Sequence, residues 1–267
     1  MPELKYKIFV INMQRSKDRW INICGQLEKF NVPYERIEGV DISQLTQSEI
    51  DKYYSFKKNR KTYPKPLSVG EIGCHISHIK CWEEIVKQNL DFGIVLEDDI
   101  VLDDKFADAV DFIKSNFDKW RFLRLQCEVK DKKLYNKEDF ADFSLYEFIR
   151  TSGCTWGYAL KSDTATTLVN EIPPFGITAD TNMHLYHKFG IDVKTLMPPV
   201  VFDRPVNDSI IEDLRVRKKS KNFYPFARQV FSFKAYMSMV RYLMKRDGAK
   251  VFIRRMIKSK NIKKYVR

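Results

Sequence analysis

Three consecutive carboxylates are the side chains of this sequence best placed to do chemistry. Glu97, Asp98 and Asp99 follow the apolar run Gly93–Leu96, whose composition is typical of a buried strand. Negative charges gathered at the end of a strand repel one another unless a cation or strong donors compensate them. Hard cations such as Mg²⁺ or Mn²⁺ are held by few carboxylates and complete their shell with water and substrate phosphates. The triplet therefore predicts a metal and diphosphate site; the alternative is a solvated turn in which the two aspartates cap a helix.

Strands and helices alternate around the triplet, and their order predicts an α/β sheet of mixed direction flanked by helices. Besides the run that ends in the triplet, strands are predicted at Leu4–Asn12, Tyr34–Val40, Trp120–Gln126, Leu145–Arg150 and Thr155–Leu160. Helices are predicted at Arg15–Phe30, Thr46–Tyr54, Ser68–Gln88, Lys105–Asn116, Ser162–Asn170 and Thr181–Lys188. Phe56–Leu67 and Lys130–Asp142 are expected to be loops. Ligands of open α/β sheets collect outside the carboxyl ends of strands, which is where the triplet stands.

Length and composition limit the possible classes of protein. With 267 residues and 44% hydrophobic content, the chain can bury one substantial core. Its five cysteines form no CxxC pair, which argues against a disulfide framework and a structural zinc site and favours a reducing cytosol. No secretory signal is expected near Met1, and no run approaches the roughly 18–20 apolar residues of a spanning helix. The motifs GxxxxGK[ST], GxGxxG, GxSxG and HExxH are missing, so no nucleoside triphosphatase or dinucleotide oxidoreductase is suggested.

Positive charge is concentrated at the C-terminal end. The net charge is +12, yet residues 215–267 alone carry 18 Lys and Arg against one acid, Asp247. We therefore expect two parts: a catalytic domain over residues 1–214 and a basic helical tail over residues 215–267.

The tail has the pattern of basic amphipathic helices. Its apolar residues recur at spacings of three and four, at Phe226, Val230, Phe233, Met237, Val240 and Met244, and again at Phe252, Ile253, Met256 and Ile257. Such helices lie on anionic membranes, where each Lys or Arg near the surface adds roughly 1 kcal/mol. Nucleic acid is a competing partner, and packing of the first apolar stripe on the body of the protein is the other alternative.

Five segments occur in an order that resembles one enzyme family. They are Ile8–Trp20, Glu35–Asp41, Leu67–Trp82, Ile94–Ile100 and Gly153–Leu160. Together they resemble glycosyltransferase family 25, the lipopolysaccharide and lipooligosaccharide sugar transferases of Gram-negative bacteria that are also similar to collagen galactosyltransferases. The pattern GEIGCxxSHxxxW followed by LEDD is far more specific than either part. The resemblance implies a GT-A-like fold, a UDP-sugar donor that is usually UDP-galactose, and inverting transfer to a sugar acceptor.

Under this resemblance the acidic triplet looks like a DxD-type motif, with Mn²⁺ or Mg²⁺ as the cofactor. A divalent cation bridging the diphosphate would stabilise the charge that grows as UDP leaves. Asp99 is the expected direct metal ligand, with Glu97 or Asp98 on metal-bound water or the ribose. If the strand stays extended through the triplet, Glu97 and Asp99 share one face, so that Glu97 can join the metal group.

A second acidic segment, FDRPVNDSI, stands where GT-A folds often supply a late metal or phosphate contact. Asp203 is its candidate metal ligand, and Asn207, Asp208 and Ser209 follow it. The family often has Gln near this position, so the sequence departs from the pattern here.

Donor contacts are expected just after the first strand. Asn12, Arg15 and Arg19 follow it, and arginine suits bidentate phosphate contacts; the alternative is that the two arginines form a solvated helix face. His78 belongs to the SH pair of the family pattern and is a further donor-site candidate, although a helical histidine is more often a packed residue.

Two carboxylates are candidates for catalysis. An inverting transferase needs a base to take the proton of the acceptor hydroxyl, and Asp180 aligns with an acidic position of the family. The alternative is that Thr178 or Asp180 caps the following helix, on which His184 and His187 are surface residues or metal ligands. Glu71 is the other candidate, although it also forms a capping box with Ser68.

The leading hypothesis is a metal-dependent, inverting glycosyltransferase. It would move a hexose, galactose from UDP-galactose above all, onto a lipooligosaccharide or lipopolysaccharide core. The tail would attach it to the anionic cytoplasmic face of the bacterial inner membrane, close to a lipid-linked acceptor, and no nucleic acid partner is expected. The alternatives are a non-catalytic membrane or glycan-binding protein on the same scaffold and, more weakly, a metal-dependent phosphodiesterase.

Overall fold

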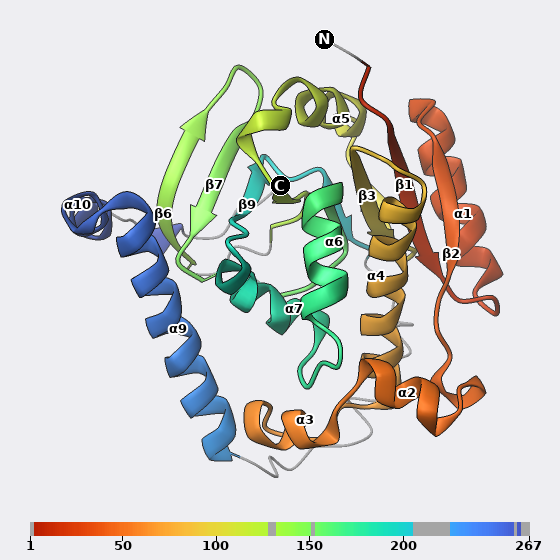
Figure 1. Cartoon of the computed structure of the whole chain (residues 1–267). Coiled ribbons are helices and arrows are strands. Elements are labelled where there is room, and N and C mark those ends of the chain that lie inside the picture. Colours follow the sequence, from red (N-terminus) through yellow and green to blue (C-terminus); the bar gives the residue numbers. More distant parts are fainter. Residues whose placement is uncertain (1–2, 128–131, 151–152, 205–224, 259–260, 263–267) are drawn as a thin grey trace.

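The structure is a computed structural model that describes residues 3–127, 132–150, 153–204, 225–258 and 261–262 (Figure 1). Within them, nine strands form one mixed sheet in the order β11-β6-β7-β9-β5-β8-β3-β1-β2. Their bounds are β1 Tyr6–Asn12, β2 Tyr34–Glu38, β3 Phe92–Glu97, β5 Phe122–Arg124, β6 Lys132–Asp139, β7 Ser144–Phe148, β8 Gly157–Lys161, β9 Val193–Met197 and β11 Asn261–Ile262. A separate ladder pairs β4 (Ile100–Leu102) with β10 (Val201–Asp203). The α/β sheet of mixed direction predicted from the sequence is confirmed.

Helices cover both faces of this sheet. The α-helices are α1 Lys17–Leu27, α2 Gln47–Tyr53, α3 Phe56–Thr62, α4 Val69–Lys87, α5 Phe106–Ser115, α6 Ser162–Glu171, α7 Ala179–Asn182, α9 Pro225–Asp247 and α10 Ala249–Lys258. The 3-10 helices are η1 Glu28–Phe30, η2 Ile42–Gln44, η3 Phe117–Lys119 and η4 Met183–Phe189. Figure 1 shows α4 and α6 side by side over one face of the sheet.

The alternation of side chains along β1 divides the core into two layers. Ile8 and Val10 belong to one buried cluster with side chains of α1 and α5, whereas Phe9 belongs to the other with side chains of α4 and α6. Successive residues of a strand point to opposite faces, so a strand buried on both sides is apolar throughout. Strand β1 lies between β2 and β3 and runs parallel to both, which brings the carboxyl ends of these three strands to one edge.

Helix α4 begins where the sequence predicts it. The Ser68 hydroxyl accepts a hydrogen bond from the Glu71 amide, and the Glu71 carboxylate accepts one from the Ser68 amide. Such a capping box satisfies donors that have no partner inside the helix. Gly73 lets α4 lie close to the backbone of Val40, because a Cβ at this position would collide with the carbonyl oxygen of Val40.

Two segments expected to be loops are regular instead. Phe56–Thr62 forms α3, and its buried Asn59 donates hydrogen bonds to the carbonyl oxygens of Lys65 and Gly176. Lys132–Asp139 forms β6, which pairs with β7 and β11. The predictions were wrong because each element depends on partners from other parts of the chain, which local composition does not reveal. The helix expected at Thr181–Lys188 begins earlier, at Ala179, and continues as the 3-10 helix η4.

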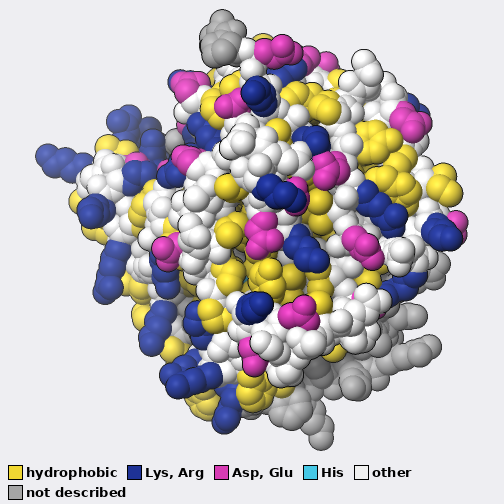
Figure 2. Space-filling view, turned by 45° about the vertical axis from the view of Figure 1, so that its right-hand side comes forward, with side chains coloured by type: hydrophobic (Ala, Val, Ile, Leu, Met, Phe, Trp, Pro, Cys, Tyr) yellow, Lys and Arg dark blue, Asp and Glu magenta, His cyan; other side chains and the backbone are white. Residues whose placement is uncertain are grey.

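The described part of the tail forms α9, α10 and the short strand β11. Helix α9 runs along one side of the molecule (Figure 1) and contacts α3 and η4, whereas α10 packs on β6. Figure 2 shows Lys and Arg side chains gathered along the edge formed by these helices. The expected boundary after residue 214 lies outside the described residues, as do Asn207, Asp208 and Ser209. Among the described helices, none has both the length and the hydropathy needed to cross a membrane.

Part of the apolar stripe of α9 faces away from the body of the protein, whereas Val240 of the same stripe packs against the buried cluster that contains Tyr135 and Phe252. Phe226, Val230, Phe233 and Met244 are exposed, whereas Ala235 and Leu243 are buried. The alternative that this stripe packs on the body is therefore wrong for those four residues. Polar contacts hold the inner side of the helix instead: Ser238 lies 2.9 Å from His187, and Arg246 forms an ion pair of 2.8 Å with Glu147.

Candidate functional site

The acidic triplet lies at the carboxyl end of β3. The strand ends at Glu97, Asp98 and Asp99 form a bend, and β4 begins at Ile100. The strand therefore does not stay extended through the triplet. The condition for Glu97 and Asp99 to share a face by alternation is not met, but their charges remain close enough to act on each other.

Asp98 is the buried member of the triplet. Its carboxylate accepts a hydrogen bond of 2.5 Å from the Asn12 amide and lies 3.4 Å from the Arg19 guanidinium. Burial raises the pKa of Asp98, while the Asn12 and Arg19 contacts oppose that rise. A buried carboxylate with these partners holds β1, α1 and the triplet together, and this position favours a supporting role over contact with a ligand.

The two arginines expected at the donor site have different partners. Arg19 lies 3.2 Å from a carboxylate oxygen of Asp99, so it belongs to the triplet and is not part of a solvated helix face. Arg15 pairs with Asp41 at 2.9 Å, and its side chain is more than half exposed. The structure therefore brings Arg19 to the triplet and leaves Arg15 paired with another acid.

Asp203 is brought to the triplet from a distant part of the sequence. In the antiparallel ladder, Asp203 of β10 is the register partner of Ile100 in β4, and the backbone N–H of Arg204 donates to the carbonyl oxygen of Asp99. Burial, followed by the charge of Glu97, raises the pKa of Asp99 to about 7, and Asp203 adds to the rise. Carboxylates that repel one another are the kind of donor that a hard divalent cation prefers, so Glu97, Asp99 and Asp203 remain candidate ligands. Among the described residues, the ligand atoms that lie within 4.8 Å of one another belong instead to Cys74, His78 and Glu97.

Buried hydrogen bonds link α4 to Tyr158 of β8 and hold His78 beside Glu97. The Trp82 indole donates to the Tyr158 hydroxyl at 2.9 Å, and the same hydroxyl lies 2.9 Å from Nδ1 of His78. Nε2 of His78 faces Oε1 of Glu97 at 3.5 Å, and that oxygen also accepts a bond of 2.6 Å from Thr155. His78 is therefore both a packed residue and a neighbour of the triplet. Thr155 and Tyr158 received no role from the sequence.

Glu71 has the contacts of a capping residue. Besides its bond to the Ser68 amide, its carboxylate lies 3.2 Å from the ammonium of Lys65, and its side chain is buried. Both carboxylate oxygens are thus engaged in local structure. The geometry favours capping over catalysis for Glu71.

Asp180 lies in the first turn of α7, beside the loop that precedes β8. One of its carboxylate oxygens accepts a hydrogen bond of 2.8 Å from the Thr181 amide, and the other would lie 3.2 Å from a Cβ placed on Gly153. Thr178 occupies the N-cap position without a side-chain capping bond. Burial raises the pKa of Cys74 well above its usual value, and the charges of Glu97, Asp180 and Asp99 add to the rise.

Two buried residues fix the segments on either side of Asp180. Nδ1 of His75 lies 3.1 Å from the carbonyl oxygen of Ile177, and its ring stacks on Phe175. The guanidinium of Arg124 donates to the carbonyl oxygen of Gly153 at 2.6 Å. Neither residue was predicted, because their partners lie far away in sequence. His187, a possible metal ligand in the sequence, contacts Ser238 of α9 instead.

Comparisons with known proteins agree with these observations. The model of the family described as "Glycosyltransferase family 25 (LPS biosynthesis protein)" matches residues 5–183. The mouse protein named procollagen galactosyltransferase 2 is 29% identical over 184 residues, which cover 64% of this chain and 28% of the relative. A Haemophilus influenzae protein named putative glycosyltransferase is 28% identical over 178 residues, which cover 65% of this chain and 61% of the relative. The chain thus spans less than two thirds of the length of these relatives.

Among solved structures, one similar chain is a Drosophila β-1,4-galactosyltransferase 7 mutant in complex with manganese, UDP-Gal and xylobiose. It is 9% identical, with a TM-score of 0.41, and the match covers 84% of this chain and 80% of that one. The family match extends over more than half of the chain, so the protein belongs to glycosyltransferase family 25.

Proposed function

We propose that this protein is a metal-dependent, inverting glycosyltransferase that moves galactose from UDP-galactose onto a sugar of a lipooligosaccharide or lipopolysaccharide core. The observation that carries the proposal is the acidic triplet at the carboxyl end of β3, beside which the pairing of β10 with β4 brings Asp203. The family match and the galactosyltransferase name of the mouse relative support the reaction and the donor.

The acidic group and its neighbours suit the departure of a nucleoside diphosphate. Glu97, Asp99 and Asp203 would hold Mn²⁺ or Mg²⁺, which when bound supplies positive charge to the leaving diphosphate. Arg19 lies beside Asp99, and its guanidinium is suited to contact a phosphate oxygen. Asn12 keeps Asp98 in place and so supports the position of the other two acids.

Asp180 is the proposed general base. Its carboxylate would take the proton of the acceptor hydroxyl as the hydroxyl oxygen attacks the anomeric carbon and the bond to UDP breaks. Its carboxylate lies beside Gly153, two residues before Thr155, which donates a hydrogen bond to Glu97, and this supports a place beside the donor site. Its bond to the Thr181 amide uses one oxygen and orients the carboxylate.

The tail supports attachment to an anionic membrane. The side chains of Phe226 and Phe233 on α9 are 79% and 66% exposed, and Lys234 and Arg241 of the same helix are exposed beside them. Exposed aromatic side chains together with Lys and Arg are typical of helices that lie in a membrane interface. We place the protein as a peripheral one on the cytoplasmic face of the bacterial inner membrane, near a lipid-linked acceptor.

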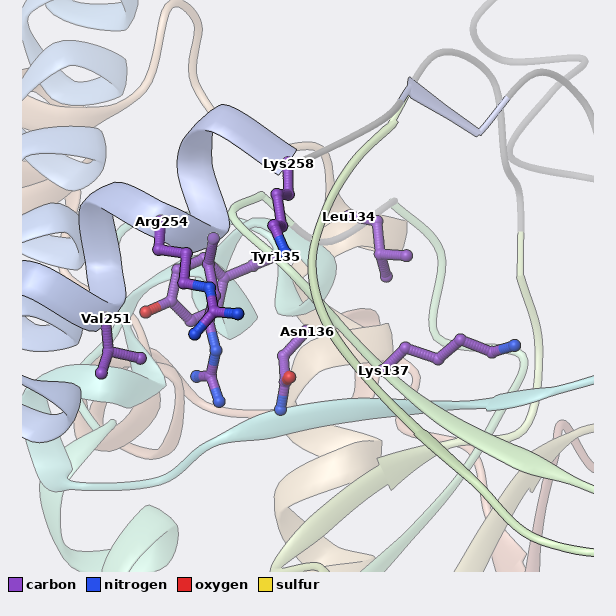
Figure 3. Close-up of a pocket in the computed structure, with 8 residues that line it drawn as sticks. Leu134, Tyr135, Asn136, Lys137, Val251, Arg254 and Lys258 are labelled. Atoms are coloured by element: carbon purple, nitrogen blue, oxygen red, sulfur yellow. The ribbon is translucent and has the colours of Figure 1, made fainter.

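A basic pocket between α10 and β6 suits the phosphate of a lipid headgroup. Its volume is about 510 Å³, and its lining residues are Leu134, Tyr135, Asn136, Lys137, Val251, Arg254, Arg255 and Lys258. Figure 3 shows Arg254 and Lys258 extending from α10 toward the side of the pocket formed by β6. Arg255 is already paired with Asp247 at 2.6 Å, so Arg254 and Lys258 are the proposed phosphate contacts.

The test measures UDP affinity and UDP release in the presence and absence of Mn²⁺. Calorimetric titration should show binding of UDP that depends on the metal, and UDP-galactose with a defined glycan core should yield UDP. Asp99→Asn should lower the release rate by more than about a hundredfold, because several kcal/mol of charge stabilisation is lost. The matched control is Asp104→Asn, which changes an exposed acid near the site.

Three outcomes would contradict the proposal. Full metal-dependent turnover by a folded Asp99→Asn variant would contradict the mechanism. A protein without metal-dependent UDP affinity would be a non-catalytic membrane or glycan-binding protein, and cleavage of the donor within its diphosphate would indicate a phosphodiesterase. Screening other UDP-sugars and acceptors tests the identity of the sugar and the acceptor, because these depend on pocket shape and hydroxyl contacts.

A further inference from the structure

Cys74 and His78 project from one side of α4 toward the end of β3. They are four residues apart, so their side chains lie one above the other on the helix. Glu97 ends β3 next to them. A ligand atom from each of these three residues lies within 4.8 Å of the other two.

The imidazole of His78 is oriented for a ligand. Its Nδ1 lies 2.9 Å from the Tyr158 hydroxyl, whereas its Nε2 is buried and has no hydrogen-bond partner. A buried nitrogen without a partner costs free energy that a ligand can recover. Metal-binding histidines commonly use one ring nitrogen for the ion and the other for a hydrogen bond that fixes the ring.

Distances between the ligand atoms suit a small tetrahedral cation. Zinc lies about 2.0–2.3 Å from nitrogen, oxygen and sulfur ligands, so two ligands of a tetrahedral site are roughly 3.3–3.7 Å apart. The 3.5 Å between Nε2 of His78 and Oε1 of Glu97 falls in this range. The bond of 2.6 Å from Thr155 to the same oxygen holds the carboxylate in place.

We propose that Cys74, His78 and Glu97 form a binding site for a thiophilic divalent cation of the zinc class, with one coordination position left open. The sulfur ligand distinguishes this site from the all-oxygen group of Asp99 and Asp203, because thiolate selects zinc over Mg²⁺ or Mn²⁺. Binding breaks the S–H bond of Cys74 and releases its proton to solvent as the sulfur–metal bond forms. Nε2 then carries the lone pair for the ion, and the ring proton sits on Nδ1, facing the Tyr158 oxygen.

Glu97 belongs to both groups of ligands. When a thiophilic cation is bound to Cys74 and His78, Glu97 is therefore no longer available as a ligand beside Asp99 and Asp203. Zinc binding should thus weaken Mn²⁺ binding, and the reverse. This competition rests on the proposed transferase site, whereas zinc binding itself does not. The two can be tested separately.

Cobalt is the spectroscopic probe for zinc binding. Co²⁺ added to the metal-free full chain should produce, at one equivalent, a thiolate-to-cobalt absorption band and the visible bands of tetrahedral cobalt, and Zn²⁺ should remove both. Calorimetry in buffers of different ionisation enthalpy should show one proton released for each zinc bound. Cys74→Ser should abolish the thiolate band and weaken zinc binding at least about tenfold.

Two further variants distinguish the loss of a metal-binding side chain from unfolding of the protein. Cys24→Ser changes another partly buried cysteine, located on α1, and should keep the cobalt bands. His78→Gln tests the second ligand, with circular dichroism as the check that the protein is folded. A thiolate band that persists in Cys74→Ser, or the lack of any such band in the parent protein, would refute the site.

Manganese binding distinguishes this site from the proposed transferase site. Electron paramagnetic resonance should detect the same Mn²⁺ affinity in Cys74→Ser as in the parent protein, because sulfur is not a ligand of the oxygen group. Loss of Mn²⁺ binding in Asp99→Asn with retained cobalt bands would confirm two separate sites. Failure of the transferase assay alone would leave the zinc result unchanged.

Discussion

The side-chain amide of Asn12 donates a hydrogen bond to the carboxylate of Asp98, and this contact joins the carboxyl ends of the neighbouring strands β1 and β3. Asp98 is buried, and its cationic neighbour is Arg19 at 3.4 Å. The pair helps to fix the position of Asp99, because Asp98 precedes it directly.

Asn12→Ala should lower the free energy of unfolding by about 1–3 kcal/mol, since a buried charged acceptor loses its donor. Denaturant unfolding followed by circular dichroism measures the loss. Asn170→Ala, at an exposed position of α6, is the control and should change stability far less. An Asn12→Ala protein as stable as the parent would mean that water replaces the amide without cost.

Tyr158→Phe should affect both stability and the proposed metal site. The substitution removes the oxygen shared by Trp82 and His78, which leaves two buried nitrogen atoms without their partner. We expect the free energy of unfolding to fall by about 1–3 kcal/mol and zinc affinity to fall by about 10–100-fold. Tyr186→Phe is the matched control, because it removes a hydroxyl from another buried tyrosine. Equal effects of the two variants would contradict a specific role for the Tyr158 hydroxyl.

His75 should make the protein less stable in acid. Burial lowers the pKa of His75 from 6.5 to about 3, so between these pH values the unfolded state binds a proton that the folded state does not. The free energy of unfolding therefore suffers no loss from His75 above pH 6.5. It falls as the pH drops towards 3, with a slope of up to about 1.4 kcal/mol per pH unit. Urea unfolding at several pH values measures this slope. His75→Gln should flatten it in this window, and an unchanged slope would assign the acid sensitivity to other groups.

Asp180→Asn should separate chemistry from binding. The asparagine keeps an oxygen for the Thr181 amide but cannot take a proton, so transfer should slow by about 10²–10⁴-fold while UDP and Mn²⁺ still bind with unchanged affinity. The control is Asp163→Asn, which alters an acid paired with Arg121 at the surface. Loss of UDP affinity together with activity would instead mark Asp180 as a donor contact.

Membrane attachment should depend on the outward face of α9. Replacing Phe226 and Phe233 by Ser should reduce binding to vesicles containing anionic lipid by more than about tenfold, because each buried aromatic side chain contributes about 1.5–3 kcal/mol. Ile21→Ser on α1 alters an equally exposed apolar residue on another element and should have no effect. Binding should also weaken as salt is added. Undiminished binding of the double variant at high salt would contradict this attachment.

Local patterns predicted the parts of the fold that local interactions determine. Ser68 and Glu71 are three residues apart, and their capping box is a contact within one helical turn. By contrast, α3 depends on contacts such as that between Asn59 and Gly176, 117 residues apart. The same difference explains which residues of the candidate site could be predicted from the sequence. The triplet is contiguous and could be found, whereas Cys74 has no recognisable role until β3 brings Glu97 beside it.

The fixed position of α9 has a consequence for how an acceptor would be selected. Ser238 of α9 contacts His187 of η4, and η4 continues directly from α7, which carries Asp180. If α9 lies in the lipid headgroups, the candidate base stands at a set height above the bilayer. Such an enzyme would select among similar sugars by their distance from the lipid anchor, in addition to recognising their hydroxyl groups.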